Sequence, residues 1–119
     1  MLDIPFRSAR QLAADIRKKK IGCLELLDLY LARVDKYDPA INAVVVRDAD
    51  RARRRARAAD RALAKGDVWG PLHGVPVTIK ESYDVAGLPT TWGLPALKDN
   101  VAAKNAVAVD RLLGAGAVL

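Results

Sequence analysis

The stretch Gly70–Glu81, Gly-Pro-Leu-His-Gly-Val-Pro-Val-Thr-Ile-Lys-Glu, decides how the rest of the chain is organised. Its first half is rich in turn residues, and its second half favours an extended backbone. Because side chains alternate along a strand, the aliphatic residues are expected to share one face: Val75, Val77 and Ile79. Lys80 then lies on the other face. The pattern predicts a buried strand that ends by presenting an ammonium group.

The surroundings of Lys80 decide what its amine can do. A lysine that points inward is desolvated, which lowers its pKa and allows the neutral amine to act as a base. A lysine that reaches solvent stays protonated and does no such chemistry. Taken alone, the residue pattern leaves both interpretations open, and a solvated lysine at a strand end is the simpler one.

The same stretch and the following Asp84–Gly93, Asp-Val-Ala-Gly-Leu-Pro-Thr-Thr-Trp-Gly, resemble the amidase signature family. The similarity continues to Leu119. In fold, the resemblance implies part of an α/β/α sandwich with a mixed β-sheet, which agrees with the alternation of helices and short apolar strands. In function, it implies an amide hydrolase whose catalytic triad joins a lysine, a serine in cis conformation and a serine nucleophile. Lys80 matches the lysine.

The resemblance also implies what the chain lacks. The family's glycine- and serine-rich segment would follow Leu119, so residues 1–119 are expected to be the N-terminal fragment of a single amidase domain, inactive alone. The substrate of the complete protein would be a small-molecule amide, cleaved to an acid and ammonia or an amine. An alternative is the amidase subunit of a glutamyl/aspartyl-tRNA amidotransferase. The residues Trp92-Gly93-Leu94 stand where the family more usually has glycine followed by serine, so the resemblance does not decide the subfamily.

The composition is typical of a globular chain, with 119 residues of which 51% are hydrophobic and 29% charged. No apolar run approaches the roughly 18 residues needed to cross a bilayer. Charged residues near the N-terminus replace the apolar centre of a secretory signal, so we expect a cytoplasmic protein without membrane association. One cysteine and one histidine cannot build a disulfide or a Cys/His metal site, and we expect neither metal nor cofactor.

The net charge of +6 comes mainly from one segment, in which eight basic residues stand against three acidic ones between Arg47 and Lys65. A helix there would present a basic face: Arg53, Arg54, Arg57 and Arg61. Such a face leaves a non-catalytic basic RNA-binding module as an alternative function. A solvated amphipathic helix explains the pattern without a partner, and no aromatic stacking platform accompanies it. We therefore expect no nucleic-acid partner.

Helical periodicity predicts two helices in residues 8–38. Ser8 and Gln11 form a capping box at the start of the first helix, which is expected to stop near Gly22. The second helix is expected over Cys23–Tyr37, with an apolar face. These two helices could also supply the surface of a homodimer.

The rest of the chain divides into three blocks. Residues 41–65 are expected to form a strand at 41–46 and a helix from 48 to 65, with a stripe of small residues: Ala49, Ala52, Ala56, Ala59 and Leu63. The lysine strand and its loop occupy 70–95. A helix and the start of an apolar strand fill 106–119.

The other side chains that could take part in chemistry are expected to have structural roles. His73 is expected to be a structural histidine in the turn, and Cys23 a buried structural thiol and a poor helix cap. Ser82 would share a face with Lys80 if the strand continued, but it lacks a glycine-rich oxyanion loop and is interpreted as a site wall or structural residue. The loop Thr90–Gly93 is expected to face the lysine end of the strand.

Overall fold

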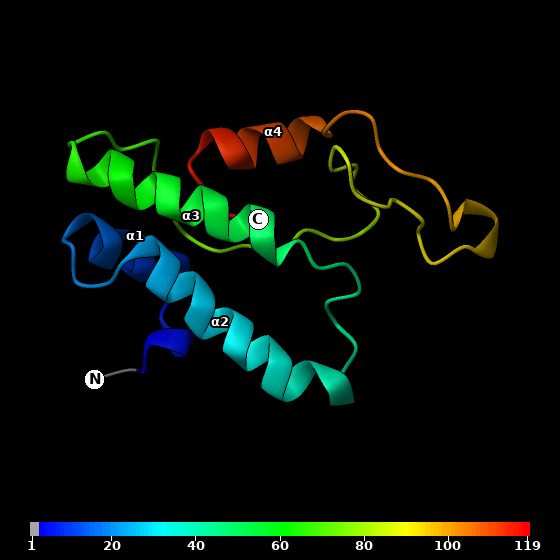
Figure 1. Ribbon diagram of the computed structural model, residues 1–119, viewed down its shortest axis with the longest axis horizontal. Helices are drawn as coiled ribbons and strands as arrows, with labels where there is room; N and C mark the ends of the chain where they lie inside the picture. The colour runs from blue at the N-terminus through cyan, green and yellow to red at the C-terminus, as the bar shows by residue number, and fades with distance from the viewer. Residues whose placement is uncertain (1–2) are drawn as a thin grey trace.

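The computed structural model describes residues 3–119, so the first two residues of the predicted 1–119 unit lie outside the described part. The α-helices are α1 (Ala9–Arg17), α2 (Cys23–Tyr37), α3 (Ala49–Ala64) and α4 (Val107–Gly114). Short 3-10 turns are η1 (Ile4–Phe6), η2 (Asp38–Ala40) and η3 (Pro95–Leu97). Figure 1 shows α3 between α2 and α4, while the loop that contains η3 extends away from the helices.

The start of α1 confirms the predicted capping box. Ser8 Oγ accepts a hydrogen bond from the Gln11 N–H at 3.2 Å, and Gln11 Oε1 accepts one from the Ser8 N–H at 2.8 Å. The predicted end near Gly22 is wrong, since α1 ends at Arg17. Lys19 adopts a left-handed φ of 56°, and the next N–H returns to the Asp15 carbonyl at 2.9 Å. This closing turn satisfies the last carbonyls and stops the helix.

Helix α2 has the predicted bounds, and its first turn is capped from another helix. Asp60 on α3 accepts hydrogen bonds from the backbone N–H of Cys23 at 2.7 Å and of Leu24 at 3.1 Å. Glu25 Oε2 accepts the Gly22 N–H at 3.2 Å. The expectation of a cysteine cap is wrong, because the N-cap residue is Gly22, which has no side chain to offer. The Asp60 carboxylate supplies the cap instead and suits the positive end of the helix dipole.

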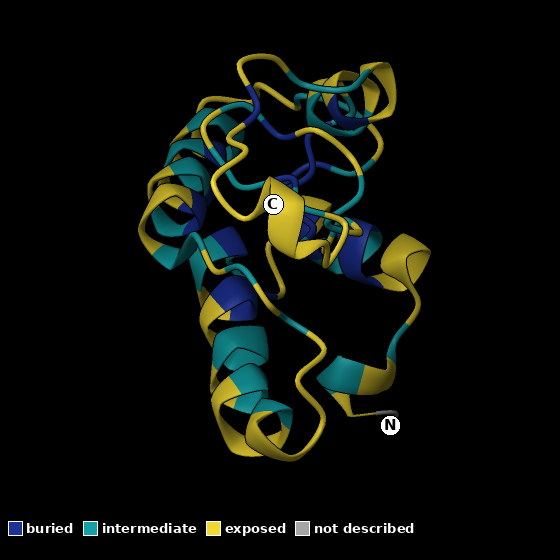
Figure 2. Ribbon diagram, turned by 90° about the vertical axis from the view of Figure 1, so that its right-hand side faces the viewer, coloured by how far each residue is buried: buried dark blue, intermediate teal, exposed yellow. Residues whose placement is uncertain are grey.

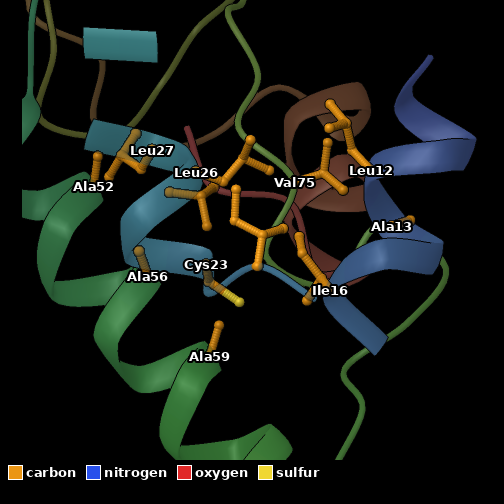
Figure 3. Close-up of a cluster of buried hydrophobic side chains, with 12 residues drawn as sticks. Leu12, Ala13, Ile16, Cys23, Leu26, Leu27, Ala52, Ala56, Ala59 and Val75 are labelled. Carbon is orange, nitrogen blue, oxygen red and sulfur yellow. The ribbon is translucent and has the colours of Figure 1, made fainter. Parts of the chain in front are cut away.

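The hydrophobic core lies where α1, α2 and α3 meet (Figure 3). The predicted stripe of small residues on α3 is buried at Ala52, Ala56 and Ala59. In Figure 3, Ala52 lies beside Leu27 and Ala59 beside Cys23, and the small side chains of α3 let the two helices approach closely. Side chains of α1 and of the central stretch complete the cluster: Leu12, Ala13, Ile16 and Val75. Figure 2 shows buried segments on several elements, and the buried residues outside this cluster include Val85, Thr90 and Val109.

Sheet pairing in residues 3–119 is limited to two isolated bridges, a parallel one between Pro76 and Val118 and an antiparallel one between Pro89 and Val101. Around the first, the Val77 N–H donates to the Val118 carbonyl at 2.8 Å. The predicted lysine strand and C-terminal strand therefore lie side by side. Neither is long enough to count as a strand, because each lacks further partners in the described chain.

The predicted strand at 41–46 is wrong. The segment is an irregular loop in which Asn42 has a left-handed φ of 53°. Asp38 Oδ1 accepts the backbone N–H of Ala43 at 2.7 Å and of Val44 at 3.1 Å. These side-chain bonds take donors that a strand ladder would use, and apolar β-branched residues alone do not make a strand without a neighbouring one. No helix of residues 3–119 has both the length and the apolar character to span a membrane.

Candidate functional site

Lys80 ends the extended segment that starts at Val75. The Tyr83 N–H donates to the Lys80 carbonyl at 3.0 Å, so the chain turns immediately after the lysine. Burial follows the expected alternation only in part, since Val75 is buried and Val77 and Ile79 are half-buried, whereas Thr78 and Lys80 are exposed. The Lys80 ammonium makes no hydrogen bond or ion pair with residues 3–119.

A cleft of about 480 Å³ surrounds Lys80, and we call it the Lys80 cleft. Its lining comes from segments that are distant in sequence: Val45, Val46, Lys80, Glu81, Ser82, Pro89, Thr91, Trp92 and Gly93. Ser82 lies on the turn rather than on a continued strand, so the predicted shared strand face does not exist, although both side chains line the cleft. The loop expected to face the lysine does so through Thr91, Trp92 and Gly93.

Thr90 does not line the cleft, contrary to the expectation for the loop. It is 4% exposed, and its backbone N–H donates to the Asn100 carbonyl at 2.9 Å. The Asn100 side-chain amide donates back to the Thr90 carbonyl at 2.8 Å. Thr90 therefore belongs to the base of the loop, next to the bridge between Pro89 and Val101.

Glu81 holds the tip of this loop, a role that sequence reasoning missed. Its carboxylate accepts the Thr91 N–H at 2.6 Å, the Trp92 N–H at 3.0 Å and a short hydrogen bond from the Thr91 hydroxyl. These three donors favour the ionised carboxylate and lower the pKa of Glu81, with the Thr91 hydroxyl contributing most. The only available signal was an acidic residue directly after the lysine.

His73 is structural, as predicted. It is fully buried, its Nδ1 accepts the Trp69 N–H at 3.0 Å, and its Nε2 lies 3.0 Å from the Ala59 carbonyl. The first bond makes Nδ1 the acceptor, so Nε2 carries the proton and donates to Ala59. Both ring nitrogens are occupied by backbone groups, which leaves no position for proton transfer to a substrate.

Cys23 is a buried thiol, also as predicted. Burial first, and then the hydrogen bond and charge of Asp60, raise its pKa to about 12. The turn that contains His73 does pack onto this cysteine, because a Cβ on Gly74 would lie 2.2 Å from Cys23 Sγ. A thiol that stays protonated and covered in this way is a poor nucleophile.

The arginines of α3 serve mainly to join elements. Arg55 donates to the carbonyls of Leu113 at 2.7 Å and Ala117 at 2.8 Å, and its guanidinium stacks 5.0 Å from the centre of the Trp69 ring. Burial lowers the pKa of Arg55. Arg53 pairs with Asp28 at 2.8 Å. The predicted basic face is thus interrupted, and its members without an ion pair in residues 3–119 are Arg54, Arg57 and Arg61. Residues 3–119 contain no group of three or more histidine, cysteine, aspartate or glutamate residues that could hold a metal ion.

Comparison with known sequences gives a consistent result. A family model described as Amidase matches residues 25–119. The chain is 44% identical over 109 residues to an acylamidase of Rhodococcus erythropolis, covering 92% of this chain and 23% of the relative. It is 44% identical over 112 residues to an indoleacetamide hydrolase of Bradyrhizobium diazoefficiens, covering 94% of this chain and 21% of the relative. It is 37% identical over 119 residues to a subunit of the glutamyl-tRNA(Gln) amidotransferase of Acidothermus cellulolyticus, covering 100% of this chain and 24% of the relative.

Solved structures similar to this chain are also amidases. A bacterial aryl acylamidase of the amidase signature enzymes superposes with a TM-score of 0.90 at 30% identity, over 96% of this chain and 24% of that chain. A peptide amidase from Stenotrophomonas maltophilia superposes with a TM-score of 0.88 at 30% identity, over 98% of this chain and 24% of that one. The chain therefore has the architecture of about a quarter of this α/β fold, which explains why so little of a sheet is present.

Proposed function

Since this chain belongs to the amidase family, we propose that it supplies the lysine base of an amide hydrolase and that Lys80 is that base. The observation that carries the proposal is the position of Lys80, which lines an open cleft at the end of an extended segment and has no partner in residues 3–119. The neighbouring carboxylate supports the same role. Glu81 is occupied by the Thr91–Gly93 loop, so its carboxylate does not form an ion pair with Lys80.

Lys80 is exposed in residues 3–119, so the proposed reaction requires the rest of an amidase domain to cover the cleft and exclude water from the amine. The neutral amine of Lys80 then accepts a proton from a cis serine, which in turn accepts the proton of a serine nucleophile. The nucleophile oxygen bonds to the amide carbonyl carbon, and the carbon–nitrogen bond breaks. The nitrogen leaves as ammonia or an amine with the transferred proton, and water hydrolyses the acyl-serine ester to release the acid. The serines of this chain are Ser8 and Ser82, and neither matches the family's nucleophile or cis serine.

The 119 residues alone are proposed to be inactive. A base contributes only part of the rate, and the nucleophile and the oxyanion donors would come from outside this quarter of the fold. Purified chain should therefore release no ammonia from small amides. Measurable turnover that disappears in both Lys80→Ala and Ser82→Ala would overturn this proposal and would assign a serine–lysine pair within the chain.

The role of Lys80 can be tested in a chimaera. This chain replaces the matching segment of the Rhodococcus erythropolis acylamidase, to which it is 44% identical over 109 residues. Lys80→Ala should lower turnover by at least about 100-fold, because general base catalysis contributes roughly 10²–10⁴-fold. Lys104→Ala, which removes an exposed lysine outside the cleft, is the matched control and should retain full turnover. A folded Lys80→Ala chimaera with near-normal turnover would exclude Lys80 as the base.

A second candidate function is the amidase component of a tRNA-dependent amidotransferase. The identity of 37% across all 119 residues with a subunit of a glutamyl-tRNA(Gln) amidotransferase favours it. The two candidates differ in their partners, because such a component works with other subunits on charged tRNA and a stand-alone amidase does not. Purification of the protein from its native host with stoichiometric partner proteins would favour the amidotransferase. Recovery of an active enzyme without them would favour the stand-alone amidase.

A further inference from the structure

One carboxylate determines the shape of a wall of the Lys80 cleft. Glu81 accepts hydrogen bonds from the backbone N–H groups of Thr91 at 2.6 Å and Trp92 at 3.0 Å, together with the Thr91 hydroxyl. The Thr91 hydroxyl oxygen also accepts the Gly93 N–H at 3.3 Å. Thr91 and Trp92 are thus bonded directly to Glu81, and Gly93 is connected to it through Thr91.

The loop needs such an anchor because its backbone is unusual. Trp92 has a φ of 57° and Gly93 a φ of 69°, both in the left-handed region. Glycine adopts this region freely, but a bulky residue such as tryptophan does so rarely and only where surrounding contacts hold it. In the described chain those contacts are the turn bond from the Leu94 N–H to the Thr91 carbonyl at 2.9 Å and the bonds that join Thr91 and Trp92 to Glu81. Without them, the loop is expected to leave this conformation and to move Trp92.

The position of Trp92 matters because of what lines the cleft with it. The lining has an apolar part, formed by Val45, Val46, Pro89 and Trp92. The polar part includes Lys80, Ser82 and Thr91. Trp92 is 66% exposed in residues 3–119, so its indole is not part of the core that these residues form. An indole held at the edge of such a cleft offers a large apolar contact area to a bound molecule.

We propose that Glu81 is a positioning residue that holds the Thr91–Gly93 loop as one wall of the Lys80 cleft, and that Trp92 on this wall makes the site prefer amides with an aromatic or other large apolar group. The proposal rests on the proposed function, because it assigns a substrate class to the same cleft. Glu81 acts through the loop and takes no part in bond breaking. Oε1 accepts both backbone N–H groups and Oε2 accepts the Thr91 hydroxyl, so only a side chain without these oxygens, as in Glu81→Ala, removes all three bonds.

The anchor can be tested in the 119-residue chain, independently of catalysis. The protein contains two tryptophans, Trp69 and Trp92, so labelling with 5-fluorotryptophan gives two ¹⁹F resonances that Trp92→Phe assigns. Glu81→Ala should move the Trp92 resonance toward the position of free 5-fluorotryptophan and leave that of Trp69 unchanged. Asp99→Ala, which removes an exposed acid in the same loop region, should move neither. An unchanged Trp92 resonance in Glu81→Ala would overturn the anchor.

The substrate preference can be tested in the acylamidase chimaera with acetamide and phenylacetamide. Trp92→Ala should lower the ratio of kcat/KM for phenylacetamide to that for acetamide by about tenfold or more, mainly through KM. Glu81→Ala should change the ratio in the same direction, and Leu94→Ala, which alters an exposed residue outside the lining, should not. Equal losses on both substrates, or losses confined to kcat, would overturn the proposal. If the Lys80 assignment itself is wrong, the Lys80→Ala chimaera will keep its activity, so the two proposals fail in different measurements.

Discussion

The carboxylate of Asp60 on α3 caps α2 by accepting the backbone N–H of Cys23 at 2.7 Å. The same carboxylate accepts the Leu24 N–H at 3.1 Å, so one side chain satisfies two N–H groups at the start of the helix. The contact joins residues that are 37 positions apart. It ties together the two helices whose interface forms the centre of the core.

Removal of this cap should destabilise the protein. We expect Asp60→Ala to lower the free energy of unfolding by about 1–2 kcal/mol, the range measured for helix caps. Urea unfolding followed by circular dichroism measures the change. Asp67→Ala, which removes an exposed acid just after α3, is the control and should have little effect. Equal stability of the two variants would contradict the capping role.

Gly74→Ala should be strongly destabilising because two effects combine. The residue has a φ of 74°, and an added Cβ would lie 2.2 Å from Cys23 Sγ. We expect a loss of about 3 kcal/mol or more, since left-handed strain and overpacking each contribute about 1–3 kcal/mol. Gly66→Ala has a similar φ of 81° but nothing within 4 Å, so it isolates the conformational effect. A loss no larger than that of Gly66→Ala would show that the clash is relieved by movement.

Cys23 should be unreactive in the native protein. With a pKa of about 12, the thiol stays protonated at pH 8, and the group is buried. A disulfide reagent such as Ellman's reagent should therefore react only after addition of denaturant. Rapid stoichiometric reaction of the folded chain at pH 8 would contradict this environment.

The same pKa shift predicts a loss of stability in alkali. The folded state holds the Cys23 proton up to about pH 12, whereas the ordinary value is 9.0, so the unfolded state loses its proton first. Stability should fall as pH rises between these two values. Cys23→Ala removes this dependence, and urea titrations of both proteins at several alkaline pH values would compare the slopes.

The Glu81 anchor should be lost in acid. Its pKa lies below the ordinary value of 4.5 because the carboxylate accepts the Thr91 and Trp92 donors. The anchor should therefore be complete above pH 4.5 and disappear as pH falls through the lower folded-state pKa. The ¹⁹F resonance of Trp92 should follow this titration, and in Glu81→Gln it should be independent of pH in this range. A Trp92 resonance that titrates identically in both proteins would assign the change to another group.

Arg55 should not be replaceable by lysine. Its guanidinium donates to the carbonyls of Leu113 and Ala117 and stacks on Trp69, which a single ammonium group cannot do at once. We expect Arg55→Lys to reduce stability by about 1–2 kcal/mol, the value of one or two hydrogen bonds from a charged donor. Arg54→Lys, on the exposed side of α3, should be neutral. Thermal unfolding of the two variants makes the comparison.

Local elements were predictable because their signals are local. The Ser8 and Gln11 capping box involves groups three residues apart, and the bounds of α2 and the alanine stripe of α3 follow from periodicity within one segment. Lys80 became the candidate base through the resemblance of the surrounding stretch to the amidase signature family. These features need no knowledge of which segments meet in space.

Tertiary structure alone decided the contacts between segments. The segment 41–46 has strand-forming residues, but a strand requires a partner, and there the Asp38 side chain takes the backbone donors instead. Nothing in the sequence links Asp60 to Cys23 or Glu81 to the Thr91–Gly93 loop, because a carboxylate accepts any donor that folding brings within reach. The sequence by itself thus determined the helices and the candidate lysine. The packed chain determined which side chains cap, anchor and surround them, because hydrogen bonds depend on distance in space and not on distance along the chain.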